Sequence, residues 1–194
     1  ATAAGIETVG DFFSYNLALS LREKYGPAKY ITSHNACAHI DNLLDIVKGI
    51  KYWLDDDGVF VLEVGYLVDV YSNTWFDTIY HEHVDFHSVS PFEKLFSRVG
   101  MEVISVHRIA PQGGSIRVMT QKKGGKFQRD SSVDKLINLE KKLNLDKAET
   151  FLKFDEKIRL VSEKLQKLVY YLKDQGKTIA GFGAPTKATT LMAH

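Results

Sequence analysis

The sequence predicts an α/β fold with a sheet that is at least partly parallel. Between residues 11 and 122, segments with helical spacing of apolar residues alternate with short β-prone runs. Residues 59–64 form a nearly continuous apolar run, which is typical of a strand covered on both faces. Alternation of this kind favours parallel strands joined by crossover helices.

The first elements follow from apolar spacing and from turn residues. We expect helices over residues 11–25 and 40–54, with a strand at 29–33 between them. Residues 55–58, Asp-Asp-Asp-Gly, indicate a turn before the strand at 59–64.

The next elements predict an edge to the sheet. Ser90, Pro91 and Glu93 indicate a helix start with a capping box, and Gly100 indicates the end of that helix. Two strands follow at 102–109 and 115–122, with a short connection. Because the two are adjacent along the chain, we expect an antiparallel edge.

The last third of the chain is mostly helical by pattern. Residues 131–175 predict helix, and apolar side chains between Phe151 and Leu172 alternate spacings of three and four. This stripe favours packing within the protein, and a coiled-coil dimer is the alternative, so both a monomer and a homodimer stay open. Residues 177–180 predict a buried strand, and a helix should begin near Lys187.

Composition limits the classes of protein. The 194 residues are 44% hydrophobic, which is enough for one full core. A net charge of +1 gives no electrostatic reason to expect nucleic acid, and no apolar run approaches the roughly 20 residues of a membrane helix. The single cysteine, Cys37, fits a reducing compartment, so we expect a cytoplasmic protein. Both ends look cut, and we expect a piece of a longer protein.

Four consecutive residues carry proton-transfer chemistry. Tyr80, His81, Glu82 and His83 supply a phenol, two imidazoles and a carboxylate. They follow a buried strand, and open α/β sheets bind ligands beyond the carboxyl ends of their strands. An acid–base site is favoured over mutual capping with nearby backbone. Metal binding is the least favoured, because His-Glu-His does not place two imidazoles on one helical face.

Three other segments could join that site. Asn35 and His39 follow the strand at 29–33, so they should meet the cluster at the same edge of the sheet. Gly113 and Gly114 precede Ser115 and Arg117, which could donate to carbonyl or phosphate oxygens; a plain glycine turn is the alternative. The segment 181–187 combines glycines, Lys187 and a helix start, which suits an anion. A tight turn without ligand is its alternative.

Four segments together resemble one family, the sugar C-methyltransferases. They are residues 35–39 (Asn-Ala-Cys-Ala-His), 76–83 (Phe-Asp-Thr-Ile-Tyr-His-Glu-His), 113–118 (Gly-Gly-Ser-Ile-Arg-Val) and 181–187 (Gly-Phe-Gly-Ala-Pro-Thr-Lys). The resemblance covers nearly the whole chain, and the string at 76–83 is its most specific part. It implies transfer of a methyl group from S-adenosylmethionine to a ring carbon next to a ketone in a nucleotide-linked deoxy-sugar.

The resemblance also implies the domain organisation. Residues 1–125 would be the C-terminal half of a class I, Rossmann-like methyltransferase domain. Residues 126–176 would be a helical linker or hairpin, and 177–194 the start of a second Rossmann-like domain. The family's glycine-rich cofactor loop and its zinc-binding domain are absent from this chain. The resemblance implies zinc only in that absent domain. We expect this piece alone to be inactive.

Site roles are carried over residue by residue. His83 would be the base that removes the proton, and Tyr80 and His39 would donate to the enolate oxygen. Glu82 would orient a histidine or bind a sugar hydroxyl or amine. Cofactor contacts fall on Asn35 and Ala36, and substrate contacts on His81, Ser115, Arg117, Gly183 and Lys187. A keto-sugar isomerase on the same scaffold and a non-catalytic oligomerisation or binding module are the alternatives.

Overall fold

The fold is built on a four-stranded sheet with the order β1-β2-β4-β3. A computed structural model describes residues 2–183 and 185–193. The strands are β1 (Ala28–His34), β2 (Leu54–Gly65), β3 (Met101–Ile109) and β4 (Ser115–Lys122). β1 and β2 are parallel, while β4 is antiparallel to both of its neighbours.

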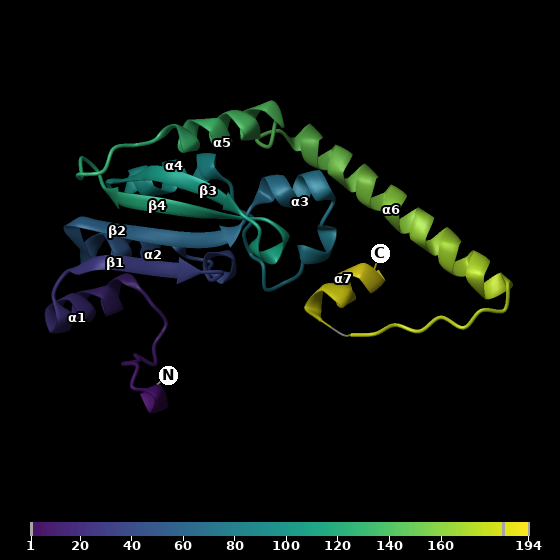
Figure 1. Cartoon of the computed structure of the whole chain (residues 1–194), viewed down its shortest axis with the longest axis horizontal. Helices are drawn as coiled ribbons and strands as arrows, with labels where there is room; N and C mark the ends of the chain where they lie inside the picture. The colour runs from purple at the N-terminus through teal and green to yellow at the C-terminus, as the bar shows by residue number, and fades with distance from the viewer. Residues whose placement is uncertain (1, 184, 194) are drawn as a thin grey trace.

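This strand arrangement confirms the predicted α/β fold. β4, the last strand in the described chain, runs antiparallel between β2 and β3, which point in the same direction. The second half of a class I methyltransferase sheet has this arrangement. The expected antiparallel edge is confirmed, because β3 and β4 pair antiparallel at one end of the sheet. β4 inserts between β2 and β3, so β3 forms the edge (Figure 1).

Helices surround the sheet and extend from it. The α-helices are α1 (Tyr15–Tyr25), α2 (Leu43–Trp53), α3 (Leu67–Asn73), α4 (Val89–Arg98), α5 (Ser131–Lys142), α6 (Ala148–Asp174) and α7 (Thr186–Ala193). Short 3-10 turns are η1 (Thr2–Ala4), η2 (Cys37–His39), η3 (Phe76–Thr78) and η4 (Pro111–Gly113). The helices expected at 11–25 and 40–54 are confirmed with shorter bounds. α3 lies in a stretch for which the sequence analysis predicted no helix or strand.

One hydrophobic core joins the sheet to its helices. Alternate residues of β2, including Phe60, Leu62 and Val64, point to one face and pack with α2 and α4. Phe92 and Phe96 of α4 are almost fully buried there, with ring centroids 6.0 Å apart. Apolar packing of this kind positions the carboxyl ends of β1 and β2.

The predicted turn at 55–58 is wrong, because β2 already begins at Leu54. Pairing with β1 jumps from Ala28–Leu54 to Tyr30–Val59, so the acidic residues form an irregularity within the strand. Lysines compensate their charge: Lys29 pairs with Asp55 and Asp57, and Lys122 with Asp56. These ion pairs join residues far apart in the sequence, so the turn residues at 55–58 could not predict them.

The predicted capping box at Ser90–Glu93 is also wrong. α4 begins after Ser88, whose side chain makes no capping hydrogen bond. Glu140 of α5 caps α4 instead. Its carboxylate accepts hydrogen bonds from Val89 N at 2.6 Å and from Ser90 N at 3.0 Å. It also accepts from Ser90 Oγ at 2.6 Å and from the Tyr66 hydroxyl at 3.0 Å. A buried side chain from another helix therefore caps α4.

The helical third is broken once. α5 ends at Lys142, and Asn144 has a φ of 52° before α6 begins at Ala148. Of the apolar stripe between Phe151 and Leu172, only Phe154 and Ile158 are buried, and they pack with Val70 and Phe76. Farther along α6, Val161, Leu165 and Leu168 are exposed. No described helix is both long enough and apolar enough to cross a bilayer.

The chain then returns to the sheet. Residues 177–180 were expected to form a buried strand, which is wrong: they are exposed and pair with no strand of the described chain. Figure 1 shows α6 leading away from the sheet and this extended segment bringing α7 back toward η3. The Thr190 hydroxyl donates to the Ile79 carbonyl at 3.0 Å, which ties α7 to the loop that carries Tyr80 and His83.

Candidate active site

The candidate site lies beyond the carboxyl ends of β1 and β2. β1 ends at His34, and the next residue, Asn35, turns the chain with a φ of 51° while its N–H donates to the Glu63 carbonyl at 2.8 Å. Asn tolerates this left-handed conformation better than most residues do. The turn directs η2 across the end of the sheet, as the sequence predicted for Asn35 and His39.

The loop with the proton-transfer cluster is fastened to η2. Val84 N donates to the Ala38 carbonyl at 2.9 Å. His39 Nδ1 lies 2.7 Å from the Glu82 carbonyl oxygen. These bonds bring segments more than 40 residues apart to one place, and they set His39 beside His83 with ring centroids 5.0 Å apart.

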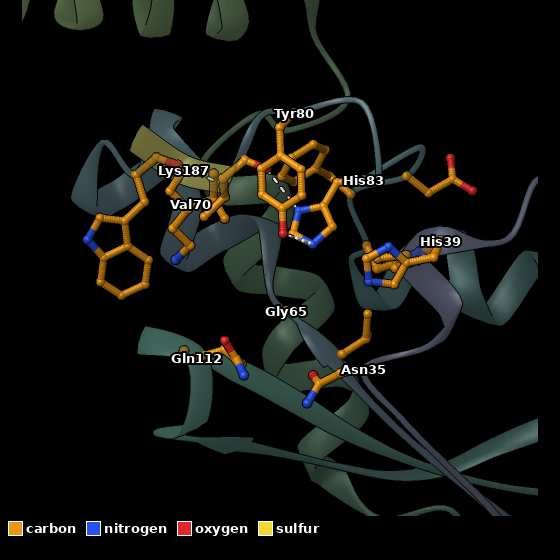
Figure 2. A pocket seen from close by; sticks show the side chains of 16 residues that line it. Asn35, His39, Gly65, Val70, Tyr80, His83, Gln112 and Lys187 are labelled. Carbon is orange, nitrogen blue, oxygen red and sulfur yellow. Dashed lines mark hydrogen bonds between the residues drawn. The ribbon is translucent and has the colours of Figure 1, made fainter. Parts of the chain in front are cut away.

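His83 and Tyr80 form a hydrogen-bonded pair. His83 Nδ1 lies 2.8 Å from the Thr78 carbonyl oxygen, and His83 Nε2 lies 3.0 Å from the Tyr80 hydroxyl. A carbonyl only accepts, so Nδ1 carries the proton and Nε2 of the neutral ring presents a lone pair. The Tyr80 hydroxyl therefore donates to Nε2. Figure 2 shows this bond on one wall of the pocket.

The same rule assigns the tautomer of His39. Its Nδ1 donates to the Glu82 carbonyl, so the Nε2 of a neutral His39 is an acceptor. Burial is the largest influence on Tyr80, followed by the charge of Glu82, and both raise the pKa of the phenol. Tyr80 is therefore a neutral donor at physiological pH.

These side chains face a cavity of about 220 Å³. In Figure 2, Asn35 and Gln112 lie across the opening from Tyr80 and His83, and Lys187 of α7 enters from the side. The cavity thus combines an acid–base pair, two amides, the Lys187 cation and the Asp85 carboxylate on a partly apolar surface. Its apolar wall comes from Ala38, Val64, Val70, Trp75 and Phe86.

Five of the predicted site residues line this cavity together: Asn35, His39, Tyr80, His83 and Lys187. Ala36 instead lines a neighbouring hollow of about 740 Å³ along β1, which shares His39 with the cavity. The Glu82 carboxylate is exposed and lies 4.0 Å from Nε2 of His81, whose side chain is 85% exposed.

The other predicted substrate contacts are occupied or distant. The Ser115 hydroxyl donates to the Pro111 carbonyl at 3.0 Å. Arg117 donates through Nη2 to Glu63 at 2.8 Å, an ion pair between neighbouring strands. Gly183 lies in the exposed segment before α7 and does not line the cavity.

Gln112, Trp75 and His87 also line the cavity, although they were not among the predicted site residues. Gln112 precedes a glycine pair that was singled out, and its φ of 59° could have been suspected from that context. His87 is 7% exposed, and its ring stacks on Phe92 with centroids 4.8 Å apart. Burial lowers the pKa of His87, which favours the neutral ring. No local pattern distinguishes such a buried histidine from an exposed one.

The donor set does not suit a metal ion. Among residues 2–183 and 185–193, no three His, Cys, Asp or Glu side chains gather in a way that could hold one. The only cysteine, Cys37, is buried, and burial raises the pKa of its thiol.

Strand order and site define the class: half of a class I methyltransferase sheet with a histidine–tyrosine pair at its ligand-binding edge. Comparison with known proteins agrees. Residues 110–194 match the family described as C-methyltransferase C-terminal domain. The chain is 31% identical over 193 residues to C-methyltransferase NovU of Streptomyces niveus, covering 100% of this chain and 46% of that protein. The chain is therefore similar to a C-methyltransferase over its whole length and to the family's C-terminal domain over residues 110–194, and it spans about half the length of the curated relative it matches.

Solved structures resemble the sheet region only distantly. Magnesium protoporphyrin IX methyltransferase from Synechocystis aligns with a TM-score of 0.40 and 8% identity, covering 50% of this chain and 46% of that one. An O-methyltransferase from neocarzinostatin biosynthesis, NcsB1, aligns with a TM-score of 0.40 and 17% identity, covering 49% and 29%. At these scores the likeness carries no argument, and the fold rests on the strand order.

Proposed function

We propose that this chain is part of an enzyme that transfers a methyl group from S-adenosylmethionine to a ring carbon next to a ketone in a nucleotide-linked deoxy-sugar. The hydrogen-bonded His83–Tyr80 pair in the cavity carries the proposal. A carbon next to a ketone must lose a proton before it can attack a methyl group. This step needs a base that is neutral near pH 7 and a donor for the oxygen that becomes negative.

His83 is the base in this proposal. Its Nε2 takes the proton from the carbon, the electrons of the C–H bond form a carbon–carbon double bond, and the ketone oxygen becomes an enolate. The imidazolium that results has N–H groups at both ring nitrogens. Its Nδ1–H donates a hydrogen bond to the Thr78 carbonyl, which lies 2.8 Å from Nδ1. For this transfer, the substrate carbon must take the place of the Tyr80 hydroxyl at Nε2.

The displaced Tyr80 hydroxyl is then free to donate to the enolate oxygen. Its raised pKa keeps the proton on the phenol until the charge develops. Neutral His39 suits this role less well, because its one N–H already donates to the Glu82 carbonyl. His39 Nε2 is better suited to accept from a substrate hydroxyl. Lys187 adds a positive charge to the same cavity.

The positions of Asn35 and Ala36 support a methyl-donor site beside the cavity. A bound S-adenosylmethionine would supply the electrophilic methyl group: as the new carbon–carbon bond forms, the sulfur–methyl bond breaks, the enolate returns to the ketone, and S-adenosylhomocysteine is the leaving group. Asn35 lines the cavity, while Ala36 and Ser33 line the adjoining hollow along β1. A ligand that occupied both spaces would approach the substrate past His39, which the two spaces share.

The test compares two histidines of the same loop. It needs a polypeptide that spans the full length of the C-methyltransferase relative, because this chain covers 46% of it. With labelled S-adenosylmethionine and keto-sugar nucleotides, His83→Ala should lower methyl transfer by roughly 10²–10⁴-fold and leave cofactor affinity near wild type. His81→Ala is the matched control and should stay active, since that side chain is exposed. Normal turnover by His83→Ala would remove His83 from this role.

A keto-sugar isomerase is the second candidate, because the same pair can move a proton to and from such a carbon. The two differ in their products. An isomerase would exchange the substrate proton in deuterated water and place no labelled methyl group on carbon. A His83→Ala variant that loses this exchange would still assign the base.

A further inference from the structure

A basic hollow lies at the opposite end of the sheet from the candidate active site. Its position follows from the register: Lys122 ends β4 opposite Met101, whereas the candidate site adjoins Gly65 at the other end of β2. The hollow measures about 650 Å³, within the range of small-molecule sites. It is lined by Tyr15, Arg22, Asp45, Lys48, Lys51, Tyr52, Arg98, Val99 and Lys122.

Positive charge exceeds negative charge in this hollow. Five of its lining residues are cationic, and Asp45 is the one carboxylate among those described. Asp45 is already engaged, since its Oδ2 accepts from Tyr15 N at 2.9 Å. The concentration is local, because the whole chain carries a net charge of only +1.

Two of the five cations have partners within the protein. Lys122 pairs with Asp56 at 2.8 Å. Arg22 donates to the Tyr52 carbonyl at 2.7 Å and to those of the next two residues at 3.2 Å, but these acceptors are neutral and leave its charge uncompensated. Within the described part of the chain, Lys48, Lys51 and Arg98 form no ion pair.

Helix dipoles explain these charges only in part. Lys51 and Arg98 lie in the last turns of α2 and α4, where cations are favoured. Arg22, however, already satisfies the carbonyls at the end of α2, and Lys48 lies one turn earlier. Side chains from α1, α2, α4 and β4 surround a concave space. A solvated helix face would present its charges on a convex surface.

We propose that this hollow binds a diphosphate group, either as inorganic pyrophosphate or as part of a nucleoside diphosphate. Lys and Arg are the side chains that bind phosphate oxygens, and several uncompensated cations favour a ligand with several negative charges. Tyr52 lies at the rim with 39% of its area exposed, and its ring contacts the Arg22 guanidinium, which lies 5.5 Å from the ring centroid, and the ring of Tyr15. The proposal is independent of the methyltransferase chemistry.

Calorimetric titration with pyrophosphate at low ionic strength tests the site. The double variant Lys48→Gln/Lys51→Gln should bind pyrophosphate about tenfold more weakly than wild type and with a smaller salt dependence. Lys164→Gln/Lys167→Gln is the matched control, because it removes two exposed lysines with the same spacing from α6. It should bind like wild type, and circular dichroism should show both variants folded.

A second titration, with uridine diphosphate, separates the two sources of the ligand. Tighter binding than pyrophosphate, reduced to the pyrophosphate level by Tyr52→Ala, would assign a nucleoside diphosphate; equal binding would assign the diphosphate alone. If uridine diphosphate also bound at the candidate active site, that binding would remain in the Lys48→Gln/Lys51→Gln variant. Binding to the basic hollow is therefore measured as the difference in affinity between wild type and this variant. The proposal is overturned if wild type does not bind millimolar pyrophosphate, if both double variants weaken equally, or if only an acidic peptide binds.

Discussion

Gly114 lines the candidate cavity and is also required by close packing. A Cβ at this position would lie 2.5 Å from Asp69 Cγ, and the φ of 153° is also unusual for other residues. Asp69 in turn binds Arg108, so the glycine leaves room for a partly buried ion pair. At Gly113, a Cβ would meet the Trp75 ring at 2.8 Å. This close packing sets the wall of the cavity that includes Gln112.

Gly114→Ala should therefore destabilise the protein by roughly 2–4 kcal/mol, through steric overlap and backbone strain. Gly124→Ala is the control, because Gly124 also has a positive φ, of 79°, but no atom lies within 4 Å of an added Cβ. Urea unfolding monitored by fluorescence should show a much smaller loss for Gly124→Ala. Equal losses would mean that the backbone conformation alone requires glycine at 114.

At the scale of elements, α5 and α4 are joined through one carboxylate. Glu140 is 4% exposed and receives four hydrogen bonds, from Tyr66, Val89 N and both the N–H and hydroxyl of Ser90. Charge-assisted bonds of this kind stabilise a buried carboxylate, and removing it would leave several donors without partners.

Glu140→Ala should cost about 3 kcal/mol of unfolding free energy. Glu93→Ala should cost less than about 1 kcal/mol, because Glu93 forms a partly exposed ion pair with Arg129 and does not cap α4. Paired denaturation curves for the two variants decide between these capping schemes. A larger loss for Glu93→Ala would restore the capping box that the sequence suggested.

The heptad stripe of α6 divides into a buried and an exposed half. Ile158→Ala should destabilise by about 2 kcal/mol, because Ile158 is 8% exposed and packs with Val70 and Phe76. Leu165→Ala should change stability by less than about 0.5 kcal/mol, since Leu165 is 43% exposed. Denaturation at several protein concentrations provides the measurement. A large, concentration-dependent effect at Leu165 would favour the coiled-coil dimer.

At the scale of the whole molecule, one buried histidine links stability to pH. Burial lowers the pKa of His87, while Asp85 and a backbone hydrogen bond with Cys37 oppose this effect. Since an unfolded histidine titrates near pH 6.5, the unfolded chain binds more protons than the folded one just below that value. The contribution of His87 to stability is thus complete above about pH 6.5 and is lost as the pH falls through the lowered pKa.

Unfolding free energies at pH 7.5 and 5.5 test this linkage. The difference between the two should shrink in His87→Gln, because that variant lacks the buried titratable group. His107→Gln should keep the wild-type difference, since His107 is exposed on β3. A His87→Gln variant with the wild-type pH dependence would contradict the assignment.

The sequence alone determined the types of the elements that form the sheet and its flanking helices α1, α2 and α4, and the edge of the sheet where the proton-transfer residues gather. Apolar periodicity and strand ends are local properties, so α2, β2 and the strand-end position of Tyr80 and His83 could be predicted from them. The choice of Tyr80 and His83 as candidate catalytic residues was also within reach, because they are only three positions apart in the sequence.

Tertiary structure alone decided which polar groups are free to act. Arg117 was a candidate for substrate binding, yet it pairs with Glu63, 54 positions away. Glu140 caps a helix that begins 51 residues earlier, and β4 enters the sheet between strands that precede it in the chain. Such partners are chosen by packing across the whole core, and for this reason no local pattern contains them. The tautomer of His83 is another case, because it depends on the folded loop that brings the Thr78 carbonyl to Nδ1.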